Sequence, residues 1–181
     1  MVGVLISFDL PGHLYAEDVR AISASTIEKY GLREWKLAVM TNEIHGHLGI
    51  YSTLGAKMGL FALEKMGEGP LSILSYAGSV PPLSCLNDGL QISTGATLGH
   101  GAISLASTGS PFPGARFSKG DRSLELSLKK EYADRIARDI EEALRLYGHE
   151  KGYWQRVRAL AFEYWSSWDR KEIFDIQDFN L

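Results

Sequence analysis

The sequence predicts an α+β protein, a mixed or antiparallel sheet with helices packed on it. Three observations support this fold class: short strand-like segments, helices placed between them without a regular βαβ alternation, and a last third that turns helical. The 181 residues fit one domain. We expect its core over about residues 15–147, with a C-terminal helical extension over 148–181. At 45% hydrophobic residues, the chain can build a core without disulfides or metals.

The first half of the chain contains both predicted strands and predicted helices. The apolar run Val2–Phe8 predicts a strand. Residues at helical spacing, with Gly31 as a stop, predict a helix over Tyr15–Tyr30, and a second is expected over Leu32–Asn42. Leu71–Ala77 has the composition of a buried strand and is followed by two prolines.

The clearest helix of the first half is predicted over Thr53–Met66. Gly55 and Gly59 lie four residues apart in this helix, so one side of it carries no side chains there. Because each glycine costs about 1 kcal/mol against alanine inside a helix, the pair indicates that another backbone packs very close to it.

The second half begins with strands. Strands are predicted over Ala102–Ser107 and Ser123–Leu128, the latter with alternating leucines. Lys119–Asp121 has the composition of a hairpin turn joining Arg116–Ser118 to the second of these strands.

Two helices and a tail are predicted to complete the chain. The helices are expected over Lys129–Tyr147, stopped by Gly148, and over Tyr153–Trp168. The tail 174–181 is expected to dock through Phe174, Ile176 and Phe179. The many aromatic residues of this region predict a homodimer, because aromatic side chains are enriched in interface cores; the alternative is that they fill the domain's own core. They are Tyr153, Trp154, Phe162, Tyr164, Trp165, Trp168 and Phe174.

Charge and cysteine content exclude several classes of function. With 19 basic and 22 acidic residues and a net charge of -3, the chain has no basic excess for binding nucleic acid. No apolar stretch has the length of a membrane span or the flanks of a signal peptide. Cys85 is the one cysteine, so it forms no internal disulfide. We therefore expect a cytoplasmic protein.

The first candidate for chemistry is the pair of histidines in His45-Gly46-His47. On a helix, residues two apart point about 200° apart and cannot hold one ion. On an extended or looped segment they share a side, and Gly46 permits a bent backbone. The pair is therefore a metal-chelating candidate off a helix, and otherwise two ordinary loop histidines.

Cys85 is the second candidate. The prolines before it and Ser84 as an N-cap predict that it begins a helix, where the helix dipole favours a thiolate. Asp88 lies one turn later on the same face. The alternative interpretation is a small buried cysteine beside a capping or solvated carboxylate.

The glycine-rich segment Thr94–Gly101 is the third candidate. Its glycines predict a tight turn into the strand at Ala102, and backbone N–H groups in such a turn can hold an anion. Thr97 and His100 are the side chains that it offers to a site. The spacing is not that of a P-loop.

These three segments together resemble one known family, that of the FmdE subunit of formylmethanofuran dehydrogenase (the FmdE-like family). Ile44–Leu48 is similar to the family's His-Gly-His segment, and Cys85–Gln91 to its Cys-x-x-Asp-x-hydrophobic-Gln segment. Thr94–Gly101 is similar to its Thr-Gly-x-Thr-hydrophobic-Gly-Lys-Gly segment. The three occur in the family's order. The resemblance implies an FmdE/GAPDH-domain-like fold, without the zinc finger that some members append.

The resemblance and the residues together predict a metal site made of His45, His47 and Cys85. Two imidazoles and a thiolate suit a divalent transition metal, zinc before nickel or iron. The sequence departs from the family at Gly49 and Ala96, where cysteines are usual, and at His100, which replaces a lysine. These departures argue against thiol redox chemistry.

Three functions fit this site. The first is a metal-binding accessory or stand-alone relative of the FmdE subunit, which the resemblance connects with one-carbon metabolism. The second is a small metal-dependent enzyme acting on an anionic small molecule, with Asp88 or Glu43 as base and Lys57 or the Gly99–Gly101 turn holding the anion. The third is a non-catalytic scaffold protein whose site has decayed.

Overall fold

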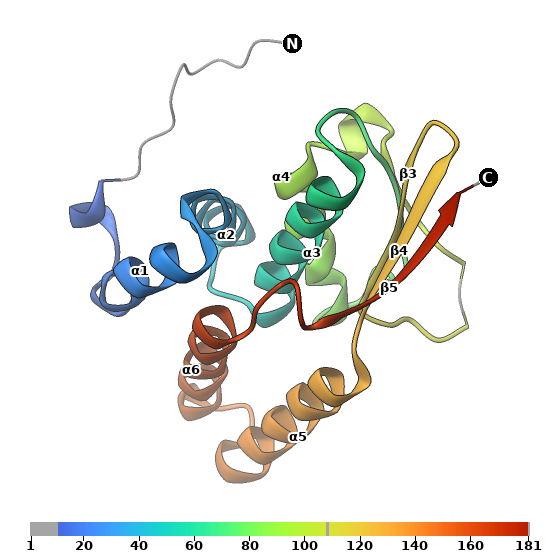
Figure 1. The fold of residues 1–181 in the computed structure, drawn as a ribbon. Helices are drawn as coiled ribbons and strands as arrows, with labels where there is room; N and C mark the ends of the chain where they lie inside the picture. The colour runs from blue at the N-terminus through green and yellow to red at the C-terminus, as the bar shows by residue number, and fades with distance from the viewer. Residues whose placement is uncertain (1–10, 108, 181) are drawn as a thin grey trace.

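The computed structural model describes residues 11–107 and 109–180 of the chain. In this part, helices and a five-stranded sheet form the α+β fold that the sequence predicts (Figure 1). The helices are α1 (Glu17–Tyr30), α2 (Leu32–His45), α3 (Ile50–Met66), α4 (Leu86–Thr94), α5 (Lys130–Tyr147) and α6 (Lys151–Ser167), with 3-10 turns η1 (Gly12–Leu14), η2 (Leu83–Cys85) and η3 (Leu98–His100). The strands are β1 (Ser72–Ser75), β2 (Ile103–Leu105), β3 (Gly114–Lys119), β4 (Arg122–Leu128) and β5 (Phe174–Asn180).

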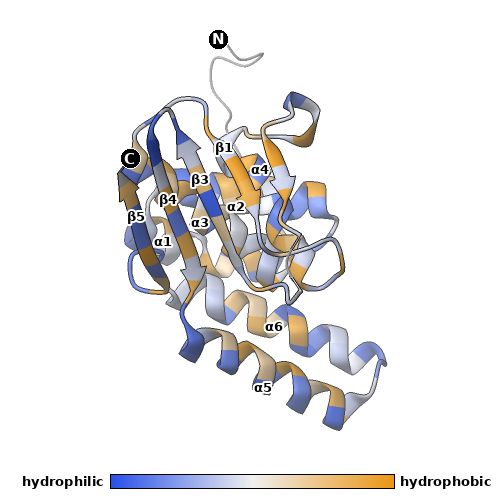
Figure 2. Cartoon of the chain, turned by 90° about the vertical axis from the view of Figure 1, so that its right-hand side faces the viewer, coloured by the Kyte–Doolittle hydropathy of each residue, from blue (hydrophilic) through white to orange (hydrophobic). Residues whose placement is uncertain are grey.

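The sheet has the order β2-β1-β3-β4-β5 and is mixed. The strands β1 and β2 run parallel, with α4 in the connection between them, and every other pair is antiparallel. A parallel pair needs such a crossover, whereas the antiparallel strands β3 and β4 are joined by a tight turn. In Figure 2 the strands lie in front of α2, α3 and α4, which cover the opposite face of the sheet, whereas α5 and α6 lie below the sheet.

The β3–β4 hairpin confirms the predicted turn. It turns at Gly120, whose φ of +58° lies in the left-handed region that favours glycine. Leu124, Leu126 and Leu128 are buried on one face of β4, as the alternation predicts, and the residues between them are half-buried.

The C-terminal tail forms a strand that the sequence did not reveal. In β5, Phe174 pairs with Leu128 and Ile176 with Leu126, so the tail extends the sheet beyond β4. The segment 148–181 was expected to be a helical extension, but its described part contributes both α6 and this edge strand. Docking is confirmed for Phe174, which is 3% exposed, but not for Ile176 and Phe179, which lie on this edge strand with 43% and 41% of their surface exposed.

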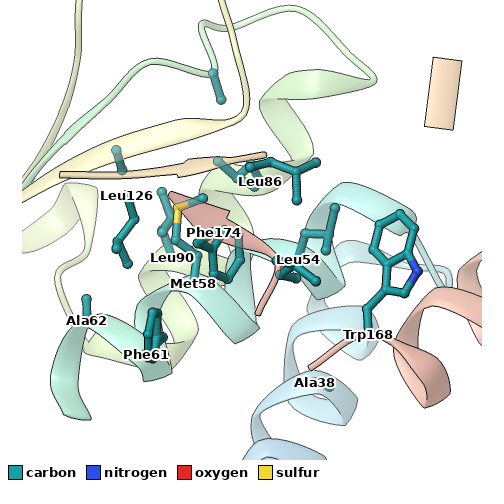
Figure 3. Close-up of a cluster of buried hydrophobic side chains, with 14 of the residues drawn as sticks. Ala38, Leu54, Met58, Phe61, Ala62, Leu86, Leu90, Leu126, Trp168 and Phe174 are labelled. Carbon is teal, nitrogen blue, oxygen red and sulfur yellow. The ribbon is translucent and has the colours of Figure 1, made fainter. Parts of the chain in front are cut away.

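The core is built around α3, which lies between α2 and the sheet (Figure 1). Every residue from Ser52 to Leu63 is buried, so this helix has no solvent face along most of its length. Leu54, Met58 and Phe61 lie in one apolar cluster with residues of α4 and of the sheet (Figure 3). Phe61 also stacks on Phe174 of β5, with ring centroids 6.3 Å apart.

The two glycines of α3 allow α4 to pack against its backbone. A Cβ atom at Gly55 would overlap the carbonyl oxygen of Leu86, and one at Gly59 would overlap the Ser93 hydroxyl. On the α4 side, a Cβ at Gly89 would overlap the carbonyl oxygen of Ser52. The close backbone approach predicted from the sequence is thus confirmed, with α4 as the neighbour.

A buried ionic cluster ties the C-terminal segment to α2 and α3. Lys57 of α3 donates to Glu34 at 2.6 Å and to the carbonyl of Trp168 at 2.8 Å, and both charged side chains are fully buried. Arg170 donates to the second oxygen of Glu34 at 2.8 Å and to Glu64 at 2.7 Å. Burial lowers the pKa of Lys57, and the Glu34 charge opposes that effect. The cluster contains two cations and two carboxylates, so its positive and negative charges cancel.

Most of the C-terminal aromatic residues serve the domain's own core. Trp165 stacks on Trp35 of α2 with centroids 4.5 Å apart, and Tyr164 stacks on Trp168 at 4.0 Å. Trp154 is the exception, with 58% of its surface exposed. The aromatic content therefore no longer supports a homodimer, which stays a prediction.

Several predicted boundaries shift by a few residues. Helix α2 continues to His45, three residues beyond its predicted end, and α3 begins at Ile50 instead of Thr53. The predicted strand Val2–Phe8 lies outside the described residues. Among the described residues, no helix combines the length and the apolar character that crossing a membrane requires.

Replacing Gly89 by alanine should destabilise the fold. The added Cβ would collide with backbone atoms of α3, and overpacking of this kind costs about 1–3 kcal/mol, more than the gain in helix propensity returns. Gly99→Ala is the matched control, because a Cβ there meets only the Thr97 hydroxyl at 3.9 Å. Urea unfolding should show the loss for Gly89→Ala alone; equal stability of both variants would contradict the close α3–α4 contact.

Replacing Glu34 by glutamine should also destabilise the protein, by about 3–5 kcal/mol, because it leaves the buried cations short of one negative charge. Glu68→Gln removes an exposed partner of Arg33 and should cost less than about 1 kcal/mol. Thermal and urea unfolding of the two variants give the comparison. If Glu34→Gln lowers the free energy of unfolding no more than Glu68→Gln does, the buried cluster does not stabilise the fold.

Candidate functional site

The two histidines lie where α2 ends and turns towards α3. His45 is the last residue of α2, and Gly46 ends the helix in the left-handed conformation, with φ of 83°. His47 lies in the turn that follows. We expected both histidines on an extended or looped segment. This is wrong for His45, because α2 continues until a residue that tolerates positive φ, Gly46, permits the chain to turn.

Asn42 fixes the shape of this turn. Its side-chain oxygen accepts from the backbone N–H of Gly49 at 2.9 Å and from the Ser52 hydroxyl at 2.8 Å. Its amide donates to the carbonyl of Ala38 and to the Thr53 hydroxyl. Sequence reasoning missed this positioning residue; the signal was a polar residue three positions before His45, on the buried face of a helix.

His45 is held by Asp88, which reaches it from α4. The Nδ1 atom of His45 lies 2.7 Å from a carboxylate oxygen of Asp88, and only 10% of the His45 side chain is exposed. A carboxylate accepts, so Nδ1 carries a proton, and in the neutral ring Nε2 carries a lone pair. Nε2 is buried and has no hydrogen-bond partner within residues 11–107 and 109–180.

His47 lies beside His45, with ring centroids 4.4 Å apart and the planes tilted by 39°. Burial, and then the neighbouring His45, lower the pKa of His47 below the usual value for histidine. Its neutral form, which is the one that binds metals and accepts hydrogen bonds, is therefore favoured.

Cys85 is half-buried and forms no disulfide; it ends η2, directly before α4. It lies near the helix start, as predicted, but the N-cap is Cys85 itself and no side chain caps the helix, so the predicted Ser84 cap is wrong. The expected thiolate is also not favoured in this protein without metal. Burial and then the Asp88 charge raise the pKa of the Cys85 thiol, and together they outweigh a backbone hydrogen bond that lowers it.

These residues do not form a preassembled metal centre. In the described part of the chain, no three histidine, cysteine or carboxylate side chains are placed so that they could hold one ion. The structure brings His45, His47 and Asp88 together. A three-ligand set that includes Cys85 would require side chains to reorient.

The remaining candidates lie elsewhere. Thr97 and His100 belong to the turn after α4, where the Thr97 hydroxyl accepts from the His100 N–H. Asp88 lies in the first turn of α4, a nine-residue helix about 13 Å long, whereas Thr97 and His100 follow its other end. The two groups of residues therefore lie at opposite ends of α4. Lys57 donates to Glu34 in the buried cluster, so its charge is already paired and does not hold an anion as expected.

Known proteins resemble this chain to different degrees. The family model described as "FmdE, Molybdenum formylmethanofuran dehydrogenase operon" matches residues 44–175. The crystal structure of a protein from Syntrophus aciditrophicus that is similar to the FmdE subunit of a tungsten formylmethanofuran dehydrogenase has a similar fold, with a TM-score of 0.53 and 15% sequence identity. That similarity covers 82% of this chain and 72% of the other.

A curated relative shares a shorter stretch. A probable S-adenosyl-L-methionine-binding protein of Archaeoglobus fulgidus is 32% identical over 72 residues, which make up 38% of this chain and 20% of the relative. The chain thus spans about a fifth of the length of that protein, and the match carries no activity with it.

The raised pKa of Cys85 predicts slow alkylation at neutral pH in protein stripped of metal, because little thiolate is present. Asp88→Asn should speed the reaction, since it removes a negative charge that disfavours the thiolate. Asp121→Asn, a change at an exposed carboxylate of the β3–β4 turn, should not. Because Cys85 is the one cysteine, the mass gained with iodoacetamide measures it alone. Alkylation as fast as that of an unfolded peptide, or indifferent to Asp88→Asn, would contradict this account.

Proposed function

This chain belongs to the FmdE family, and from that premise we propose that it is a metal-binding member in which His45, His47 and Cys85 take up a divalent transition metal. Zinc is the first choice for two imidazoles and a thiolate, with nickel or iron as alternatives. As the family's name suggests, we propose that it serves as an accessory to a one-carbon dehydrogenase, or as a stand-alone relative of such an accessory protein.

One observation carries the proposal, the state of the His45 ring. Its Nδ1 is bonded to Asp88, and its Nε2 is buried without a partner in the described residues. A buried polar atom without a partner costs about 1–3 kcal/mol, so a group that binds it would recover this free energy. Metal-binding histidines commonly donate their other ring N–H to a carboxylate, as His45 does to Asp88.

The neighbouring side chains fit the same use. The lowered pKa of His47 keeps this ring neutral and able to bind, and the half-buried Cys85 adds the sulfur. The thiol must lose its proton when it binds, so uptake of the ion should release a proton. Since the three ligands are not preassembled, binding includes the reorientation of side chains.

An ion bound by three protein ligands has a fourth position for water or a small molecule, where it can polarise what binds. The chain's own contribution is to orient the site. Asp88 sets the tautomer of His45, and Asn42 holds the turn that carries both histidines.

A decayed site in a scaffold protein is the second candidate, and Gly49 is the observation that favours it. A Cβ at position 49 would lie 3.2 Å from Nε2 of His45. The family resemblance has a cysteine at this position, so the side chain that is missing here is one that would have faced the unpartnered nitrogen.

Elemental analysis of protein purified without a histidine tag tests the proposal. We expect a transition metal that is lost in His45→Ala and in Cys85→Ser. Asp88→Asn should weaken binding by about 10–100-fold, because it removes the group that orients His45. Titration of stripped protein with zinc, followed by calorimetry and by proton release, gives the affinities.

His100→Ala is the matched control, since it removes an exposed histidine beyond the far end of α4 and should leave metal binding unchanged. Gly49→Cys should tighten binding, provided that the Ser52 hydroxyl beside it rotates away. Protein that binds no transition metal until Gly49→Cys is introduced would favour the decayed scaffold over the live site.

A further inference from the structure

A second feature is a cavity of about 450 Å³ lined by residues of α1, α2 and α6 and, next to the candidate metal site, by His47. Its volume lies in the range of small-molecule sites, about 300–1,000 Å³. Apolar side chains from three parts of the chain line it: Leu14 and Val19 near the start of α1, Val39 and Leu48 around the end of α2, and Trp165 of α6. A ligand here would place an apolar body against these surfaces.

Two of the polar groups in the lining are already engaged. Asn42 has both of its side-chain atoms bonded within the α2–α3 turn. Arg158 forms a two-point ion pair with Asp18, at 2.8 and 3.0 Å, which neutralises its charge. Neither of these groups is available to bind a ligand without losing an existing bond.

Glu43 is different. It is an exposed residue that lines the cavity, and within the described residues its carboxylate has no hydrogen bond or ion pair. The lining of the cavity therefore contains one carboxylate that no partner among the described residues neutralises. The negative charge of Glu43 disfavours anionic ligands. It favours a ligand with a hydrogen-bond donor or a positive charge, because opposite charges attract even when they are partly solvated.

We propose that this cavity binds a small organic cation, whose apolar or aromatic body lies against Trp165 and Val39 and whose ammonium-like head pairs with Glu43. The inference does not depend on bound metal. It also runs opposite to the anionic substrate expected from the sequence, since Lys57 is buried with Glu34 and the free charge here is a carboxylate.

Three probes with the same body and different heads test the proposal on the full chain, with metal removed by chelation. They are 3-phenylpropylamine, 3-phenylpropan-1-ol and 3-phenylpropanoate. Calorimetry and NMR shifts of the tryptophan side chains measure binding. The amine should bind tightest, the alcohol less tightly and the carboxylate weakest.

Two variants locate the binding. Glu43→Gln keeps the shape of the side chain and removes its charge. It should therefore weaken binding of the amine by roughly threefold or more and leave binding of the alcohol unchanged. Glu141→Gln, at an exposed position of α5, is the control and should change neither. Val39→Phe should weaken all three probes by filling the cavity, with circular dichroism to confirm folding.

The proposal is overturned by any of three results. These are a carboxylate probe that binds as tightly as the amine, an amine affinity that Glu43→Gln leaves unchanged, and no binding of any probe. Because the assay uses metal-free protein, its failure leaves the metal proposal intact, and failure of the metal assay leaves this one intact.

Discussion

The contact on which the rest of the structure depends is the backbone-to-backbone packing of α3 against α4. Gly55, Gly59 and Gly89 remove the side chains that would separate the two helices. Each glycine costs helix stability, and the cost is offset because α3 can then be buried on every side. The sheet packs on the same pair of helices, so an error in this spacing would displace both the core and the connection from β1 to β2.

The same contact builds the candidate site. Because α4 lies directly on α3, its first turn reaches the end of α2, and Asp88 can bond to His45 from 43 positions away in the sequence. Asn42 holds the other side of the site by tying the turn to the start of α3. The ring of His45 is thus positioned by two separate elements, which leaves one nitrogen oriented, buried and unpartnered within the described residues. A buried polar atom without a partner costs about 1–3 kcal/mol of folding free energy.

The C-terminal segment closes the fold in a different way, through charge and strand pairing. Lys57 lies deep in α3, where burial and the nearby Arg170 work against its charge, and Glu34, which pairs with both cations, makes the burial tolerable. The same segment continues into β5, so that one run of chain ties the ionic cluster to the edge of the sheet. It also brings Trp165 to the cavity wall, which connects the packing of α6 with a second candidate binding surface.

The sequence by itself determined the fold class, the glycine contact in α3, the β3–β4 hairpin and the family segments around His45 and Cys85. These follow from local patterns, such as periodicity, glycine spacing and turn residues, which depend on near neighbours in the chain. Only the tertiary structure decided that Asp88 pairs with His45, that Lys57 is structural, and that the tail is a strand. Pairing partners are set by long-range packing and burial, which a local pattern does not record; burial is also why the helix dipole does not leave Cys85 as a thiolate.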